Sequence, residues 1–331
     1  MSSCERDRDN VGTYVVSAEE AGLRLDVFLA ARIEDASRSF IKQAIKDERV
    51  TLKDRVVKRP GRALSEGDEI EVRLPPAPVT ELLPEDIPLD VVFEDSEILV
   101  INKPSGLVVH PAPGHPTGTL VNAVLHHCAQ FERPSGKEGD GSVFLRPGIV
   151  HRLDRFTSGV MVVAKTQRAF NSLSDQARRH AFDRRYAALV QGEIKENTGV
   201  IRASIGRSLS DRKRMSVTAV NARDAVTHFS VRERFGIASY IELRLETGRT
   251  HQIRVHLRFA GHPILGDMMY GVTDFSRWNI GEAERRVLEG LNGQALHAEL
   301  LGLVHPRTGQ KLLFEAPPPP DFQEALTEFR T

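Results

Sequence analysis

Apolar side chains recur at helical spacing near the start of the chain and predict a small module of two helices followed by strands. Leu23, Val27 and Ala30 are spaced as on one face of a helix. A second helix is predicted to begin near residue 38 behind a serine N-cap. Its apolar stripe consists of Phe40, Ile41, Ala44 and Ile45. Short apolar runs over residues 49–74 predict strands that complete the module.

A longer set of apolar segments follows and predicts a second, larger domain. Two runs within residues 91–111 have the composition of strands and flank a Lys-Pro-Ser-Gly turn. Helices are predicted from Thr119, over residues 167–180, and from Thr250 as N-cap to a stop at Gly261. The strand segments between them are separated by irregular spacers without a repeated βα unit. This pattern favours an α+β domain with a mixed, largely antiparallel sheet over a doubly wound fold.

Composition divides the chain into four parts. Its 331 residues are too many for one small core. We predict a flexible N-terminal tail over 1–20, a small α/β module over 21–74 and a larger domain over 90–331. Residues 75–89 between the two are rich in proline and acidic residues, which is typical of a linker.

Charge is segregated along the chain although the formal net charge is zero. Residues 32–62 hold ten Lys and Arg against five Asp and Glu, and residues 202–214 hold five against one. Residues 81–97 hold seven acidic residues and no basic one. Each cluster alone could be a solvated face, but together they indicate local positive fields of the kind that attract nucleic acid.

Several classes of protein are excluded by composition. Two cysteines provide neither a disulfide framework nor a thiolate zinc site. The charged N-terminus and the lack of a long apolar run predict a cytoplasmic protein that binds no membrane. His251 and His256 lie five residues apart on the predicted helix, and His126 and His127 are adjacent, so neither pair is spaced to chelate a metal.

The string HRLDRFTSG, residues 151–159, holds the strongest candidate chemistry. Arg152 and Arg155 flank Asp154, and an apolar β-branched run follows. Neighbouring cations favour an ionised carboxylate, which suits a nucleophile or a base better than a proton donor. The alternative is a surface salt bridge beside a turn. His151 is expected to make a structural hydrogen bond rather than to transfer protons.

Four strings together resemble one enzyme family. INKPSGLVVHP, HRLDRFTSG, RRYAALVQGEI and LETGRTHQIRVHLRFAGHPILGD are similar, in this order, to the motifs of the RluA/RluD-type RNA pseudouridine synthases. The similarity spans roughly residues 90–316. Residues 21–74 resemble the S4 RNA-binding domain that often precedes the catalytic domain in members acting on the large ribosomal subunit.

The resemblance implies a role for each matched residue. Asp154 is implied to be the catalytic carboxylate, which attacks the pyrimidine ring or the sugar C1′, or removes the C2′ proton. Arg254 is implied to pair with it, since a guanidinium can hold a carboxylate in a fixed geometry. Tyr186 is implied to line the uracil site, and Arg152 to fill the gap left by the flipped nucleotide. Without the resemblance, Arg254 would be interpreted as an exposed helix arginine and Tyr186 as a half-buried strand tyrosine.

The resemblance also implies partners. We expect a monomer that uses no cofactor or metal and binds large-subunit ribosomal RNA and precursor ribosomal particles. The small module would contact backbone phosphates without reading sequence. The residues predicted to do so are Arg38, Lys42, Lys46, Arg49 and Lys53.

Three alternatives remain open at the level of sequence. They are a non-catalytic RNA-binding assembly factor, a pseudouridine synthase acting on transfer RNA, and a metal-dependent hydrolase.

Two strings depart from the family pattern. GDMMYG, residues 266–271, replaces the usual GDPLYG, which implies a looser loop that touches no catalytic group. Lys53-Asp54 stands where the S4 hairpin often has Asn-Gly, and RNA binding is still expected there.

Overall fold

A computed structural model describes residues 10–33, 38–74, 82–112, 115–128, 148–208, 211, 214–217, 222–276 and 278–331. The chain divides into two compact units, an N-terminal unit up to Leu82 and a C-terminal unit from Leu83 to the end, apart from residues 134–147. The described parts contain no helix that is both long and apolar enough to cross a membrane.

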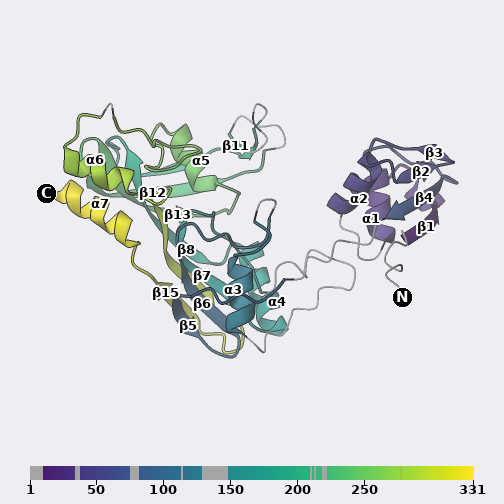
Figure 1. Ribbon diagram of the computed structural model, residues 1–331, viewed down its shortest axis with the longest axis horizontal. Helices are drawn as coiled ribbons and strands as arrows, with labels where there is room; N and C mark the ends of the chain where they lie inside the picture. Colours follow the sequence, from purple (N-terminus) through teal and green to yellow (C-terminus); the bar gives the residue numbers. More distant parts are fainter. Residues whose placement is uncertain are drawn as a thin grey trace, which may run out of the picture. The chain divides into compact units, whose positions relative to one another are not determined.

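The N-terminal unit packs two helices on a small antiparallel sheet (Figure 1). The sheet has the strand order β1-β4-β2-β3. Its elements are β1 (Asn10–Val15), η1 (Ala18–Glu20), α1 (Leu25–Arg32), α2 (Arg38–Lys46), β2 (Val50–Leu52), β3 (Arg55–Val56) and β4 (Glu69–Leu74).

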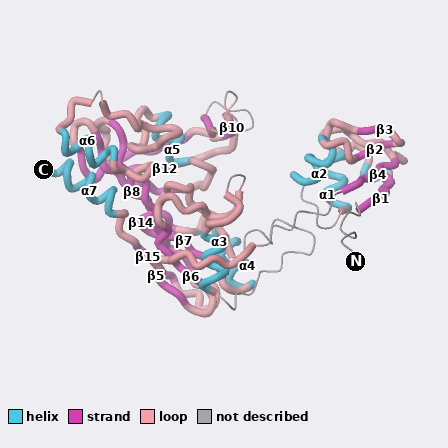
Figure 2. Tube along the Cα trace, in the orientation of Figure 1, coloured by secondary structure: helices cyan, strands magenta, loops and turns pink. Residues whose placement is uncertain are grey.

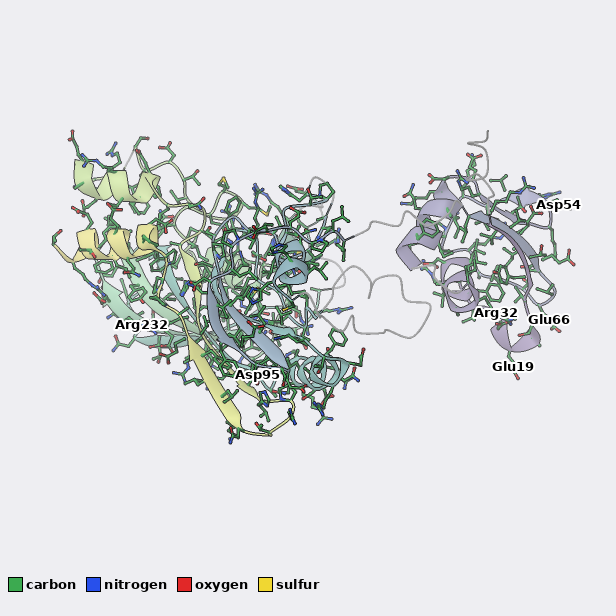
Figure 3. All side chains as sticks on the ribbon, turned by 60° about the horizontal axis from the view of Figure 1, so that its bottom comes forward. Glu19, Arg32, Asp54, Glu66, Asp95 and Arg232 are labelled. Atoms are coloured by element: carbon green, nitrogen blue, oxygen red, sulfur yellow. The ribbon has the colours of Figure 1, made fainter. Side chains whose placement is uncertain are left out.

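The turn between β2 and β3 keeps its geometry despite its unusual residues. Lys53 and Asp54 both have a positive φ, of 47° and 61°. Two successive residues in this conformation match a type I′ hairpin turn, which usually takes Asn-Gly. Asp54 lies at the outer edge of this unit (Figure 3). The departure from the family string therefore leaves the hairpin intact.

The helices of this unit bury a partly different face from the one predicted. On α2 the predicted stripe is confirmed, because Ile41, Ala44 and Ile45 are buried. On α1 the prediction was wrong for Leu23, which is 40% exposed and precedes the helix. Ala30 packs against the core, but the fully buried face is formed by Leu25, Phe28 and Leu29. The apolar residues of 23–30 fit two overlapping helical stripes, and only packing against the sheet selects one.

Residues 10–20 also differ from the predicted tail, whereas its first nine residues lie outside the described part of the chain. Strand β1 pairs antiparallel with β4 from Asn10 to Val15, and Val16 enters the core at 1% exposure. Alternation is weak here because Val11 and Val15 point to solvent, where apolar side chains are unexpected.

The C-terminal unit is built on one long twisted sheet that is confirmed to be mixed and largely antiparallel (Figure 2). Its order is β5-β6-β7-β14-β8-β13-β12-β9, with β15 also paired to β14. Strands β7 and β14 run parallel, and every other strand pair in the described part of this sheet is antiparallel. Its larger strands are β5 (Val91–Glu94), β6 (Ile98–Lys103), β7 (Ser158–Ala164), β8 (Asp183–Gln191), β9 (Thr198–Arg202), β12 (Val226–Arg234), β13 (Ala238–Leu245), β14 (Leu296–Val304) and β15 (Lys311–Glu315).

Helices cover this sheet on both faces. Leu99, Ile101, Met161 and Val163 share a core with α3, α5, α6 and α7, whereas the alternate residues of β6 and β7 pack with α4. Burial on both faces explains why these strands are continuous apolar runs. A separate two-stranded ribbon pairs β10 (Gly206–Arg207) with β11 (Met215–Ser216). The helices are α3 (Leu120–His127), α4 (Gln167–Arg178), α5 (Gln252–Phe259), α6 (Glu282–Glu289) and α7 (Pro320–Arg330).

The segment before β5 belongs to the C-terminal unit rather than to a free linker. Glu85 N donates to Asn122 O at 3.0 Å, and the Glu85 carboxylate accepts from Gly118 N at 3.1 Å. Asn122 Nδ2 donates to Leu83 O at 2.8 Å. Residues 83–89 are thus tied to the start of α3, and the rest of the predicted linker, residues 75–81, lies outside the described residues.

Candidate active site

Asp154 lies in a loop that is fixed by the Lys-Pro-Ser-Gly turn after β6. The Lys103 side chain is fully buried and donates to the carbonyls of Pro104, Leu107 and Arg155 at 2.8, 3.0 and 3.0 Å. Gly106 N also donates to Arg155 O, at 2.9 Å. Burial lowers the pKa of Lys103 to about 7, although the charge of Asp154 acts in the opposite direction. The two strings 103–106 and 151–159 are therefore parts of one structure.

Gly159, at the end of the HRLDRFTSG string, allows β7 to approach β14. Its φ is +116°, and a Cβ at this position would lie 2.2 Å from the carbonyl oxygen of Ala298. No side chain can be accommodated at that distance, so this glycine is required by the close approach of the two backbones.

Arg254 connects Asp154 to a second carboxylate that the sequence interpretation missed. Its Nη1 donates to Asp154 Oδ2 at 2.9 Å, while Nε and Nη2 donate to the two oxygens of Asp267 at 2.7 and 2.8 Å. The bidentate bond with Asp267 fixes the plane of the guanidinium, which leaves Nη1 directed at Asp154. The Asp154 side chain is 20% exposed and that of Arg254 is 8% exposed.

The charges of this trio stabilise one another. Burial opposes the charged form of Arg254, but hydrogen bonds and charges from Asp267 and Asp154 outweigh it and raise the pKa of the guanidinium. Burial likewise disfavours a charged Asp267, yet Arg254 and the backbone N–H groups of Tyr270 and Met269 lower the pKa of that carboxyl. Asp267 lies in the GDMMYG loop, so the expectation that this loop touches none of the candidate site residues is corrected: it binds Arg254, which in turn contacts Asp154.

His251 begins α5 in an unusual backbone conformation. Its φ is 56° and ψ is 23°, which costs a non-glycine residue about 1 kcal/mol. The ring Nδ1 is 2.9 Å from the Tyr270 hydroxyl, and Nε2 is 3.9 Å from Asp154 Oδ1. Burial lowers the pKa of His251, which favours a neutral ring. The N-cap of the helix that carries Arg254 is His251 rather than the predicted Thr250.

Tyr186 faces the same site from β8. It is 8% exposed, and burial raises the pKa of its hydroxyl; the positive charge of Arg184 opposes this shift, and the negative charge of Asp154 adds to it. The phenol therefore stays protonated at neutral pH. Its ring offers an apolar surface beside the carboxylate.

Two adjoining cavities open beside Asp154. One has a volume of about 60 Å³ and the other about 250 Å³. Both are lined by Arg152, Asp154, Tyr186, Arg249 and His251, together with Leu245. The candidate residues of the C-terminal unit therefore converge on one hollow, with Arg152 exposed at its surface.

The predicted phosphate-binding residues lie in the N-terminal unit. Lys46 is exposed, whereas Lys42 lies 3.6 Å from Asp26 and Lys53 lies 2.9 Å from Asp68 in ion pairs. Arg49 is partly buried and directly precedes β2. The side chain of Arg38 lies outside the described residues. These positions remain predictions as RNA contacts.

His251 and His256, at the N-cap of α5 and within it, have different hydrogen-bond partners. His256 is buried between the Thr227 hydroxyl and the Ala203 carbonyl, at 2.9 Å from each. Among the described residues, no three His, Cys, Asp or Glu side chains are grouped to share a metal ion.

His151 makes the structural hydrogen bond predicted from sequence. Its Nε2 accepts from Val162 N at 3.0 Å, and burial lowers the pKa of the ring to about 3. An unfolded histidine has a pKa of about 6.5, so the unfolded chain binds more protons between these two values. The free energy of unfolding therefore falls as the pH falls from about 6.5 towards 3.

We expect a variant with His151→Gln to lack this pH dependence, because the glutamine oxygen can accept from Val162 N without titrating. Between pH 7.5 and 5, the wild-type protein should lose about 1–2 kcal/mol more unfolding free energy than the variant. Urea unfolding at both pH values measures this. Parallel losses in the two proteins would contradict a His151 ring that stays neutral in the folded protein.

Asp267 could have been found from sequence by one signal. It stands in a glycine-bounded turn between apolar runs, where a charged side chain must be buried or paired. His251 carried no comparable signal, because its φ is set by the tertiary structure.

The chain is similar to known proteins over both of its units. A family model described as RNA pseudouridylate synthase matches residues 97–259, and an S4 domain model matches residues 23–70. The chain is 44% identical over 314 residues to the uncharacterized RNA pseudouridine synthase YlyB of Bacillus subtilis, covering 95% of this chain and 96% of that protein.

Two further relatives have more specific names. The chain is 41% identical to ribosomal large subunit pseudouridine synthase D of Neisseria meningitidis serogroup A, covering 100% of this chain and 84% of the relative. It is 39% identical to the protein of the same name in Escherichia coli O6:H1, covering 96% and 94%. The solved structure of human RNA pseudouridylate synthase domain containing 4 aligns with a TM-score of 0.55 at 25% identity, covering 73% of this chain and 93% of that one. The extent of these matches over both units shows that the chain belongs to the RNA pseudouridine synthase family and carries an N-terminal S4 domain.

Proposed function

We propose that the protein converts specific uridines of large-subunit ribosomal RNA to pseudouridine, with Asp154 as the catalytic carboxylate. One observation carries this proposal: Asp154 is held by Arg254 at 2.9 Å, and the pair opens into a hollow lined by Tyr186. The relatives named as large-subunit enzymes support the choice of RNA.

Each side chain has one task in this proposal. Asp154 supplies a charged oxygen to the nucleoside, as nucleophile or as base, while Arg254 keeps the carboxylate ionised and oriented. Tyr186 lies against the uracil ring, which must detach, rotate and rejoin through carbon. Arg152, exposed at the rim, enters the space that the flipped nucleotide leaves in the RNA.

Pseudouridine mapping of ribosomal RNA from cells with and without the gene tests the activity. Loss of one or a few sites, restored by the wild-type gene, is the expected result. If pseudouridines were lost from transfer RNA alone, the substrate would be transfer RNA and the proposed reaction would stand. An unchanged map would favour a non-catalytic RNA-binding factor. Undiminished activity in the presence of a chelator would dismiss the metal-dependent alternative.

The S4 domain is proposed to add affinity by contacting backbone phosphates. Its α2 presents Lys46 to solvent. We expect a chain lacking residues 1–80 to bind structured ribosomal RNA about tenfold more weakly. The slope of log K against log salt concentration should also be shallower, by about two to three units, than the slope for the full chain.

Filter binding of RNA across a salt series measures both effects. An unchanged slope would remove the S4 domain from the RNA interface.

We further propose that the enzyme is a cytoplasmic monomer that meets its RNA in precursor ribosomal particles.

A further inference from the structure

Arg184 lies in the proposed active site without a partner from the described part of the chain. It precedes Tyr186 by two residues on β8, so both side chains lie on one face of the strand. Both line the cavity of about 250 Å³ beside Asp154. Its Nε is buried and has no hydrogen-bond partner, and its guanidinium forms no ion pair with any residue that the structure describes. A shielded donor without an acceptor is unfavourable, which suggests that the acceptor is a ligand.

The surroundings of Arg184 favour an anion. Arg152 and Arg249 line the same cavity, and Asp154 is the one acidic residue among its described lining. The Asp154 carboxylate already accepts from Arg254. Arg249 is held in place because its Nε donates to Asp224 O at 3.1 Å. Positive charge therefore exceeds negative charge in this cavity.

Gly248 gives the guanidinium of Arg184 its space. A Cβ at position 248 would lie 2.9 Å from Nη1 of Arg184. The arginine thus lies directly against the backbone that leads from β13 to α5, next to Arg249. An alanine at 248 would displace the flexible end of Arg184, while the backbone could stay in place.

We propose that Arg184 and Arg249 hold a phosphate of the RNA backbone next to the uridine that enters the site. This rests on the proposed function, since it places the ligand beside Asp154. Guanidinium groups bind phosphate through paired, charge-assisted hydrogen bonds. Such a contact carries no sequence information, but it fixes the strand while the base is extruded. Arg184 is a positioning residue in this arrangement.

The test measures binding in proteins that all carry Asp154→Asn, so that no turnover is needed. The probe is the large-subunit ribosomal RNA stem-loop that Asp154→Asn binds most tightly, with one phosphate at a time replaced by an uncharged methylphosphonate. At one phosphate, or two neighbouring ones, the replacement should weaken binding about tenfold. Adding Arg184→Gln should weaken binding of the unmodified RNA about tenfold and reduce the further loss at that same phosphate, where Arg249 remains.

Arg185→Gln is the matched control, because it removes the same charge one residue away. Arg185 points to the other face of β8, lies 3.3 Å from Asp183 and is 42% exposed. It should leave both the affinity and the methylphosphonate profile unchanged. Gly248→Ala should cause part of the affinity loss seen with Arg184→Gln. In a variant that carries both substitutions, it should cause no further loss.

Equal losses for Arg184→Gln and Arg185→Gln would overturn the proposal, as would a methylphosphonate profile that Arg184→Gln leaves intact. Thermal melting checks that each variant is folded. If Arg184→Gln does not fold, Gly248→Ala is used in its place for the same binding measurements. A wild-type protein that forms no pseudouridine would refute the proposed function alone, because the binding profile is read separately.

Discussion

Replacing Asp154 with asparagine is expected to lower pseudouridine formation at least ~10³-fold while leaving RNA affinity within about twofold. The amide keeps the shape of the side chain and can still accept a hydrogen bond from Arg254. It cannot act as a nucleophile or a base, so the chemical step is lost while the hollow remains. Single-turnover assays with saturating enzyme measure the first effect, and fluorescence anisotropy measures the second.

Asp175→Asn provides the matched control for this prediction. Asp175 is a partly exposed carboxylate on α4 that pairs with Arg178 and Arg179 and does not line either cavity. It should retain wild-type turnover. Turnover in Asp154→Asn close to that of Asp175→Asn would show that Asp154 is not the catalytic carboxylate.

Replacing Arg254 with methionine is expected to reduce both stability and activity. The variant leaves the fully buried Asp267 carboxylate without its cation, which typically costs about 3–5 kcal/mol of unfolding free energy. It also removes the donor that orients Asp154, so pseudouridine formation should fall strongly. Urea unfolding and single-turnover assays measure the two effects.

The double variant Arg254→Met with Asp267→Asn separates these effects. The asparagine oxygen can still accept from the N–H groups of Met269 and Tyr270, and the uncompensated charge is gone. Most of the lost stability should return, while activity should stay low because Asp154 remains without its guanidinium. Recovery of activity together with stability would mean that Arg254 acts only through the fold.

The sequence predicted the parts of this site that depend on local order along the chain. Asp154, Arg254 and Tyr186 were singled out because their strings match a family in order and spacing, and the structure brings them to one hollow. Helix α3 was also predictable, because Thr119 forms a capping box with Asn122 at its start.

The rest depended on tertiary contacts. Asp267 acts through Arg254, a residue 13 positions away, and its loop had no visible link to the chemistry. Strand β1 was missed because exposed valines broke the alternation on which strand prediction rests. Elsewhere, the ion pair between Arg232 of β12 and Glu299 of β14 joins two strands that are not neighbours in the sheet, so no local pattern indicates it. Arg232 is labelled in Figure 3.

The position of β14 in the sheet has a consequence for how the enzyme is made. β7 follows the Asp154 loop and β8 carries Tyr186, but the two strands are not neighbours, because β14 pairs with both. During translation, a growing polypeptide that ends before residue 304 lacks the strand that brings those two side chains together. The newly synthesised chain therefore cannot assemble the hollow around Asp154 until almost its whole length has left the exit tunnel.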